Sequence, residues 1–139
     1  MTNTRTEEII AFAKDIRRTW GSNPIDIAHR CGIMVFFNRG EKIGAHIVKA
    51  DSYPTIISIT GCDSEAGRQV LCAHELGHAL LHESGVNRFE GSYATLVNDV
   101  EYEANLFAVA LLFDEGKFNI PFSGMSNYVL KSILDCNLK

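Results

Sequence analysis

The chain has 139 residues, a net charge of −4 and an apolar content of 46%, values that suit a single domain over residues 1–139 with a sizeable core. The negative balance, with no basic run longer than Arg17-Arg18, disfavours direct binding to nucleic acid. No apolar run approaches the roughly 20 residues that cross a bilayer, and the polar start lacks the apolar stretch of a signal peptide, so we expect a cytoplasmic protein with reduced cysteines.

The first half of the chain predicts two helices followed by three strands. Residues 7–20 have the apolar spacing of an amphipathic helix. Pro24 suits the first turn of a short second helix that runs to about Arg30. Residues 33–38, 44–49 and 55–60 read as strands, the last two rich in β-branched side chains.

The second half predicts helices. Asp63 or Ser64 can cap a long helix that reaches about His82. Residues 83–94 are rich in Gly, Asn and Ser and therefore predict a loop, one that could form the edge of a cleft. A helix over 98–112, an irregular stretch over 116–124 and a last helix over 125–136 follow. The order of helices, small sheet and helices predicts an α+β fold with a three-stranded sheet.

The segment His74-Glu75-Leu76-Gly77-His78 lies inside the long predicted helix. Residues four apart share one face of a helix, so both imidazoles can reach one ion. Glu75 is offset by about 100° and can act on a water beside that ion as a base. This H-E-x-x-H pattern indicates a zincin-like active-site helix; the alternative is a structural helix with two unrelated histidines.

Catalytic zinc usually takes three protein ligands, so a third should come from another element. The helix over 98–112 has an inward apolar stripe, and Glu101 extends this stripe backward, whereas Glu103 lies about 160° away. We therefore expect Glu101 to be the third ligand; the alternative is a surface carboxylate in a first helical turn. Asn105, one turn after Glu101, could hold a ligand or bond to local backbone. The stripe consists of Ala104, Phe107, Ala108, Leu111 and Leu112.

The sequence HELGHALLH at 74–82, followed by EYEANLFA at 101–108, resembles the ImmA/IrrE family of metallopeptidases, small bacterial and phage proteins with a gluzincin-like zinc site. Residues 23–33 are also similar to the helix and first strand of that family. In the family pattern the third ligand is a Glu four residues before an Asn or Asp, which again selects Glu101. The chain departs from the pattern at Phe113-Asp114, where members often have Met-Pro, so the resemblance does not extend to the cleft wall and loop there.

The resemblance implies a zinc-dependent endopeptidase that acts on a helix-turn-helix repressor and so relieves repression of a mobile element or stress genes. The chain has no evident helix-turn-helix of its own, so it would meet DNA only through such a partner. Two alternatives remain: a module that binds a repressor without cutting it and holds a structural metal, and a latent peptidase that needs a signal. Glu75 favours the enzyme, because a structural site has no use for an acid/base there. Histidine and carboxylate ligands suit Zn²⁺, although manganese or iron could occupy the same set.

Three further residues are candidates for contacts with an oxyanion or substrate. Tyr93 and Tyr102 carry hydroxyls that can donate to a developing oxyanion. His82, two turns after His74, could face the cleft mouth or be a solvated histidine at the helix end.

The remaining notable residues are expected to be structural. His29 and His46 have no partner at ligand spacing, and Cys72 is turned away from the ligand face of its helix. Gly77 costs up to about 1 kcal/mol inside a helix relative to Ala. It either permits close approach of another element or is simply tolerated.

Overall fold

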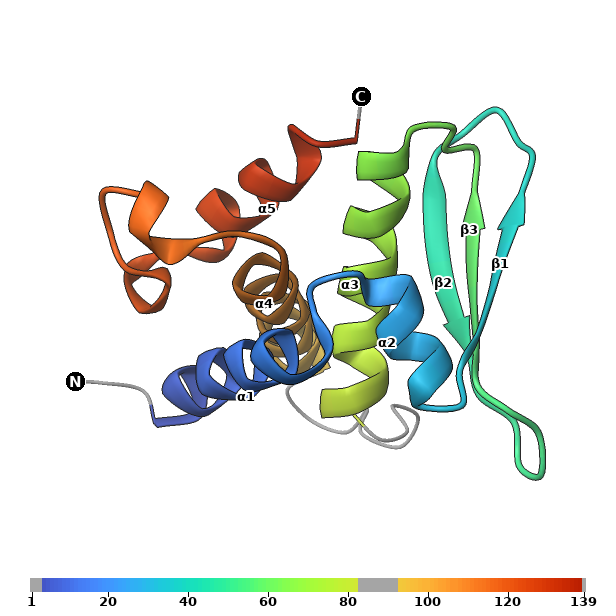
Figure 1. Ribbon diagram of the computed structural model, residues 1–139, viewed down its shortest axis with the longest axis horizontal. Coiled ribbons are helices and arrows are strands. Elements are labelled where there is room, and N and C mark those ends of the chain that lie inside the picture. The colour runs from blue at the N-terminus through green and yellow to red at the C-terminus, as the bar shows by residue number, and fades with distance from the viewer. Residues whose placement is uncertain (1–3, 83–92, 139) are drawn as a thin grey trace.

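A computed structural model describes residues 4–82 and 93–138, with the side chains of 93–98 left out of the description. The predicted α+β fold with a three-stranded sheet is confirmed (Figure 1). In chain order the elements are α1 (Thr4–Trp20), α2 (Pro24–Arg30), β1 (Met34–Asn38), β2 (Gly44–Val48), β3 (Ile56–Thr60), α3 (Glu65–Leu81), α4 (Tyr93–Leu112), the 3₁₀ helices η1 (Glu115–Lys117) and η2 (Phe122–Gly124), and α5 (Asn127–Asp135).

The sheet has the strand order β1-β3-β2, with β3 parallel to β1 and antiparallel to β2. Ile57 and Ile59 of the central strand are completely or almost completely buried, and their partners on β2 are Ile47 and Ala45. Because opposed residues share a face, these four side chains form the inner face of the sheet. Helix α3 contacts β2 and β3, so the sheet supports the helix that carries the H-E-x-x-H motif (Figure 1).

Helix α4 lies at the centre of the helical part, in contact with α1, α3 and α5 (Figure 1). All residues from 104 to 111 are buried, including those outside the predicted inward stripe. A helix that is apolar all round is surrounded by other elements. The helix also begins at Tyr93, five residues before the predicted start, so the predicted loop over 83–94 is wrong at its end; residues 83–92 lie outside the described ranges.

Several helix starts follow from capping. The Ser64 hydroxyl accepts a hydrogen bond of 3.0 Å from the Gly67 amide at the start of α3, as the sequence allows. The stretch predicted to be irregular contains two 3₁₀ helices instead. The first is capped by Asp114, whose carboxylate accepts from the Gly116 amide at 3.0 Å. The departure from the family pattern at Phe113-Asp114 therefore begins a capped turn.

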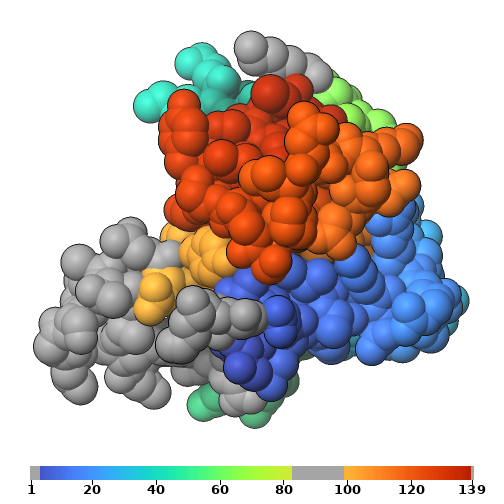
Figure 2. All heavy atoms as spheres, turned by 90° about the vertical axis from the view of Figure 1, so that its left-hand side faces the viewer, coloured from blue at the N-terminus to red at the C-terminus, as the bar shows by residue number. Residues whose placement is uncertain are grey.

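Helix α1 packs against the segment that follows α4. In Figure 2 the orange and red C-terminal segment rests on the blue helix α1. Lys14 of α1 pairs with Glu115 and lies 5.9 Å from the centre of the Phe122 ring. Within the described residues, no helix has the length and apolar character needed to cross a membrane.

Candidate metal centre

Helices α3 and α4 approach each other closely at Gly77. A Cβ atom at this position would lie 3.2 Å from both the Cα and the carbonyl oxygen of Ala104. Gly77 thus permits the close approach that was one of the two interpretations of this residue. The contact lies beside His78 on α3 and three residues after Glu101 on α4, so it brings the ligand-bearing turns of the two helices together.

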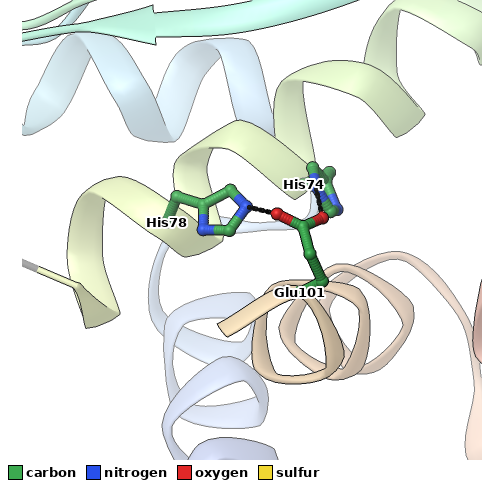
Figure 3. Close-up of side chains that lie close together, drawn as sticks. All are labelled: His74, His78 and Glu101. Carbon is green, nitrogen blue, oxygen red and sulfur yellow. Dashed lines mark ion pairs between the residues drawn. The ribbon is translucent and has the colours of Figure 1, made fainter. Parts of the chain in front are cut away.

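His74, His78 and Glu101 converge on one point (Figure 3). The Nε2 atoms of His74 and His78 lie 3.1 and 3.0 Å from the two carboxylate oxygens of Glu101. Two ligand atoms that bind one zinc ion tetrahedrally at about 2.0–2.1 Å are ~3.3 Å apart. The three side chains therefore have the spacing, and as two imidazoles and a carboxylate the chemistry, to hold such an ion.

The carboxylates of this centre have opposite electrostatic environments. Hydrogen bonds from His74 and His78 hold the pKa of Glu101 far below its ordinary value, so Glu101 is an anion. Burial raises the pKa of Glu75, which is only 8% exposed, above its ordinary value despite the nearby histidines. Burial disfavours the charged form of a carboxyl group, whereas hydrogen bonds to its anion favour that form. Glu101 is suited to bind a cation and Glu75 to exchange a proton.

Asn105 connects this centre to α5. Its side chain is almost completely buried, hydrogen-bonds His74, and donates from Nδ2 to Oδ1 of Asn127 at 2.8 Å. Burial lowers the pKa of His74, but the hydrogen bonds to Glu101 and Asn105 and the charge of Glu75 outweigh it and leave that pKa raised. The His74 ring is therefore held from both α4 and, indirectly, α5.

His82 lies between His78 and Glu103 of α4. Its Nδ1 is 3.1 Å from Nδ1 of His78, and its Nε2 is 2.9 Å from Oε1 of Glu103. Glu103 in turn accepts two hydrogen bonds from the Arg5 guanidinium of α1, at 3.0 and 3.1 Å. Burial lowers the pKa of His82. For Glu103, burial acts to raise the pKa, but the hydrogen bonds from Arg5 and His82 outweigh burial, so the pKa of Glu103 is lowered. The sequence analysis did not predict this chain of contacts.

The two candidate tyrosines are not brought to the triad by any described contact. The Tyr102 hydroxyl lies 3.3 Å from Oγ1 of Thr6 on α1. The side chain of Tyr93 lies outside the described residues. The described contact of Tyr102 gives no support to an oxyanion-binding role for it, and the role of Tyr93 stays a prediction.

A cavity of about 310 Å³ adjoins His74 and Glu101. Its walls come from α3, α4, α5 and the residues just after α5. The C-terminal part of the wall had no signal in the sequence because it depends on the path of the chain after α4. Besides His74, Glu101 and Asn105, the lining comprises Val70, Leu71, Asn127, Lys131, Leu134, Asp135 and Leu138.

Cys72 and His46 were predicted not to be ligands, and neither belongs to the group of described side chains that could hold a metal. Burial, with a smaller contribution from Glu75, raises the pKa of the Cys72 thiol to about 12, so Cys72 is a neutral core residue. His46 on β2 is close enough for its charge to lower the pKa of Glu75, although this is the smallest influence on that group. All four cysteines are free, and two of them, Cys31 and Cys136, are exposed.

Comparison with known proteins agrees with this geometry. The peptidase family described as the IrrE N-terminal-like domain matches residues 28–131. The chain belongs to this ImmA/IrrE family. It is 34% identical over 107 residues to the uncharacterized immunity region protein 2 of Bacillus phage phi105, an alignment that covers 76% of this chain and 67% of the phage protein. No solved structure is significantly similar to the chain.

Proposed function

We propose that this member of the ImmA/IrrE family is a zinc-dependent endopeptidase. In this proposal His74, His78 and Glu101 hold the ion and Glu75 is the general base. The observation that carries it is the convergence of the three ligand atoms to within 4.8 Å of one another, with Glu75 next to His74 on the same helix. The peptidase family that matches the chain supports the same chemistry.

A bound zinc ion would polarise the scissile carbonyl and lower the pKa of a water molecule from 15.7 toward about 7. The protein's own contribution is the proton transfer. Glu75 takes a proton from the attacking water and passes it to the leaving amine, a role that suits a carboxyl group whose pKa is raised by burial. A mainly structural carboxylate would be expected to have an ion-pair or hydrogen-bond partner that lowers its pKa instead.

The cavity beside His74 is the proposed site for a substrate side chain. Leu71, Leu134 and Leu138 give it apolar walls, and Lys131 and Asp135 add one charge of each sign. Such a site favours an apolar side chain on a peptide whose backbone passes the triad, because the leucines bind by excluding water. Cleavage is therefore expected next to an apolar residue.

The proposed substrate is a helix-turn-helix repressor, and the proposed location is the cytoplasm. The resemblance to the ImmA/IrrE family supports the first part, as does similarity to a protein named for a phage immunity region. The four free cysteines support the second, since thiols stay reduced in that compartment. With a net charge of −4, the protein would reach DNA through its partner and not directly.

The test compares the wild type with Glu75→Gln. Both proteins are purified, their metal content is measured by elemental analysis, and each is incubated with the repressor encoded nearest the gene. We expect one zinc per chain in both forms and cleavage by the wild type alone, because Gln keeps the shape of the side chain but cannot take a proton. Cleavage by Glu75→Gln would contradict the assigned base.

The second candidate function, a repressor-binding module with a structural metal, makes a different prediction in the same experiment. Both forms would then bind zinc and the repressor, and neither would cut. The observation in favour of this candidate is that the triad links α3 to α4 and so could serve stability alone. A wild type without metal would contradict both functions.

A further inference from the structure

Behind His78, a line of hydrogen-bonding groups leads away from the metal centre to the first helix of the chain. The rings of His78 and His82 are 3.1 Å apart at their Nδ1 atoms, and Nε2 of His82 lies 2.9 Å from Glu103. Glu103 accepts two hydrogen bonds from Arg5, at 3.0 and 3.1 Å. The four residues come from α3, from the residue that caps its C-terminal end, from α4 and from α1. Arg5 lies outside the residues 28–131 that match the family, so this anchor comes from a part of the chain that the family match does not cover.

Only one distribution of protons satisfies every link when His78 binds a metal. The Nε2 atom of His78 faces Glu101 and must be unprotonated to be a ligand, so its proton is on Nδ1. That N–H donates to Nδ1 of His82, which leaves the His82 proton on Nε2, where it donates to Glu103. A carboxylate accepts only and a guanidinium donates only, so Arg5 completes the line without ambiguity.

The line is shielded from water at its centre. The side chains of His82 and Glu103 are 10% and 17% exposed, compared with 47% for Arg5. A solvated histidine at a helix end would turn freely and would not hold a neighbouring ring. His82 instead has a defined partner on each nitrogen, and the carboxylate that fixes it is itself held by two parallel hydrogen bonds.

We propose that His82 and Glu103 are positioning residues that fix the orientation and the metal-binding tautomer of His78, with Arg5 as their anchor on α1. This inference rests on the proposed function, because it requires that His78 binds zinc. The outer partners of metal-binding histidines typically contribute 10–100-fold to metal affinity. His74 has its own, shorter support in Asn105, so the two ligands are held from different sides.

The test measures zinc affinity by competition with a chromogenic chelator for the wild type, His82→Phe and His82→Gln. His82→Phe keeps a flat ring but removes both nitrogens, and we expect zinc to bind 10–100-fold more weakly. His82→Gln supplies one acceptor and one donor, and we expect it to recover part of that loss. The matched control is Lys14→Met, which removes a different ion pair between α1 and the segment after α4. It should leave zinc affinity within about twofold of the wild type.

A second readout reports the protonation of the rings directly. Long-range ¹H–¹⁵N correlation spectra of the zinc-loaded wild type show which ring nitrogens carry protons. We expect the proton on Nδ1 of His78 and on Nε2 of His82, and we expect the His78 proton to exchange faster with solvent in His82→Phe. A proton on Nδ1 of His82 would overturn the proposal.

The outcomes separate the two levels of inference. If the wild type binds zinc and His82→Phe binds it equally well, the positioning role is wrong and the peptidase proposal stands. Equal losses in His82→Phe and Lys14→Met would show that docking of α1 matters and the hydrogen-bonded line does not, which also overturns the positioning role. A wild type that binds no zinc overturns both proposals.

Discussion

Gly77→Ala tests whether the close contact of α3 and α4 determines the geometry of the metal centre. In an exposed helix this change stabilises a protein by up to about 1 kcal/mol, because alanine is the better helix former. At Gly77 the added Cβ would meet two backbone atoms of Ala104 and the Phe107 ring, all at 3.2 Å, so α4 must move by a few tenths of an ångström. Overpacking of this kind costs about 1–3 kcal/mol. The net expectation is a loss of about 0–2 kcal/mol in the free energy of unfolding.

The assay is urea unfolding of the zinc-free protein in the presence of a chelator, followed by measurement of zinc affinity. The control is Ala11→Gly on the exposed face of α1, which reports the helix propensity difference alone. Because Ala104 lies three residues after Glu101, the same shift of α4 should also weaken zinc binding. If Gly77→Ala gains as much stability as Ala11→Gly loses, the contact has no energetic weight and the reasoning is refuted.

Two further predictions concern the ion pair and the cavity. Hydrogen bonds from Lys14 and from the Phe122 amide lower the pKa of Glu115 in the folded protein. The ionised carboxylate therefore stabilises the fold at pH values above its unfolded pKa near 4.5. This stabilisation is lost as the pH falls through the pKa of Glu115 in the folded protein. Lys14→Met should therefore reduce the unfolding free energy by about 0.5 kcal/mol near neutral pH, and the difference should vanish in acid; a constant difference down to pH of about 3 would contradict this. Leu71→Trp should fill the cavity and raise KM for the repressor without loss of zinc, whereas Ile133→Trp on α5, outside the cavity lining, should leave KM unchanged.

Helical periodicity was sufficient to predict the three members of the candidate metal centre. His74 and His78 needed only the four-residue spacing of one helix. Glu101 needed one more step, the direction of the apolar stripe on the next helix, which distinguished it from Glu103. The stripe itself was too narrow as a description of α4: residues 104–111 are apolar except Asn105 and are buried on every side. That composition was visible in the sequence and indicates a central helix.

The surroundings of the metal centre could not be predicted in the same way. The hydrogen bond between His82 and Glu103 depends on how closely and at what angle α3 and α4 pack, which no local pattern specifies. The contribution of α5 to the cavity depends on the path of the chain after α4, which begins with the turn that Asp114 caps. Both features depend on tertiary packing and not on any local sequence pattern. Residues that are distant in sequence meet there because a connecting segment follows one of several paths that its sequence allows.

Three polar residues at alternate positions in the middle of α4 hold a metal ligand in place on a helix whose other contacts are non-directional packing. Glu101 and Asn105 are one turn apart and both reach the histidine helix, whereas Glu103 points the other way, to His82 and Arg5. Apolar contacts alone would allow α4 to rotate or slide with little loss of buried area. Hydrogen bonds on both faces remove that freedom, because any rotation that improves one set breaks the other. The carboxylate of Glu101 is therefore placed by directional contacts at Asn105 and Glu103, and the close approach at Gly77 sets its distance from the two histidines.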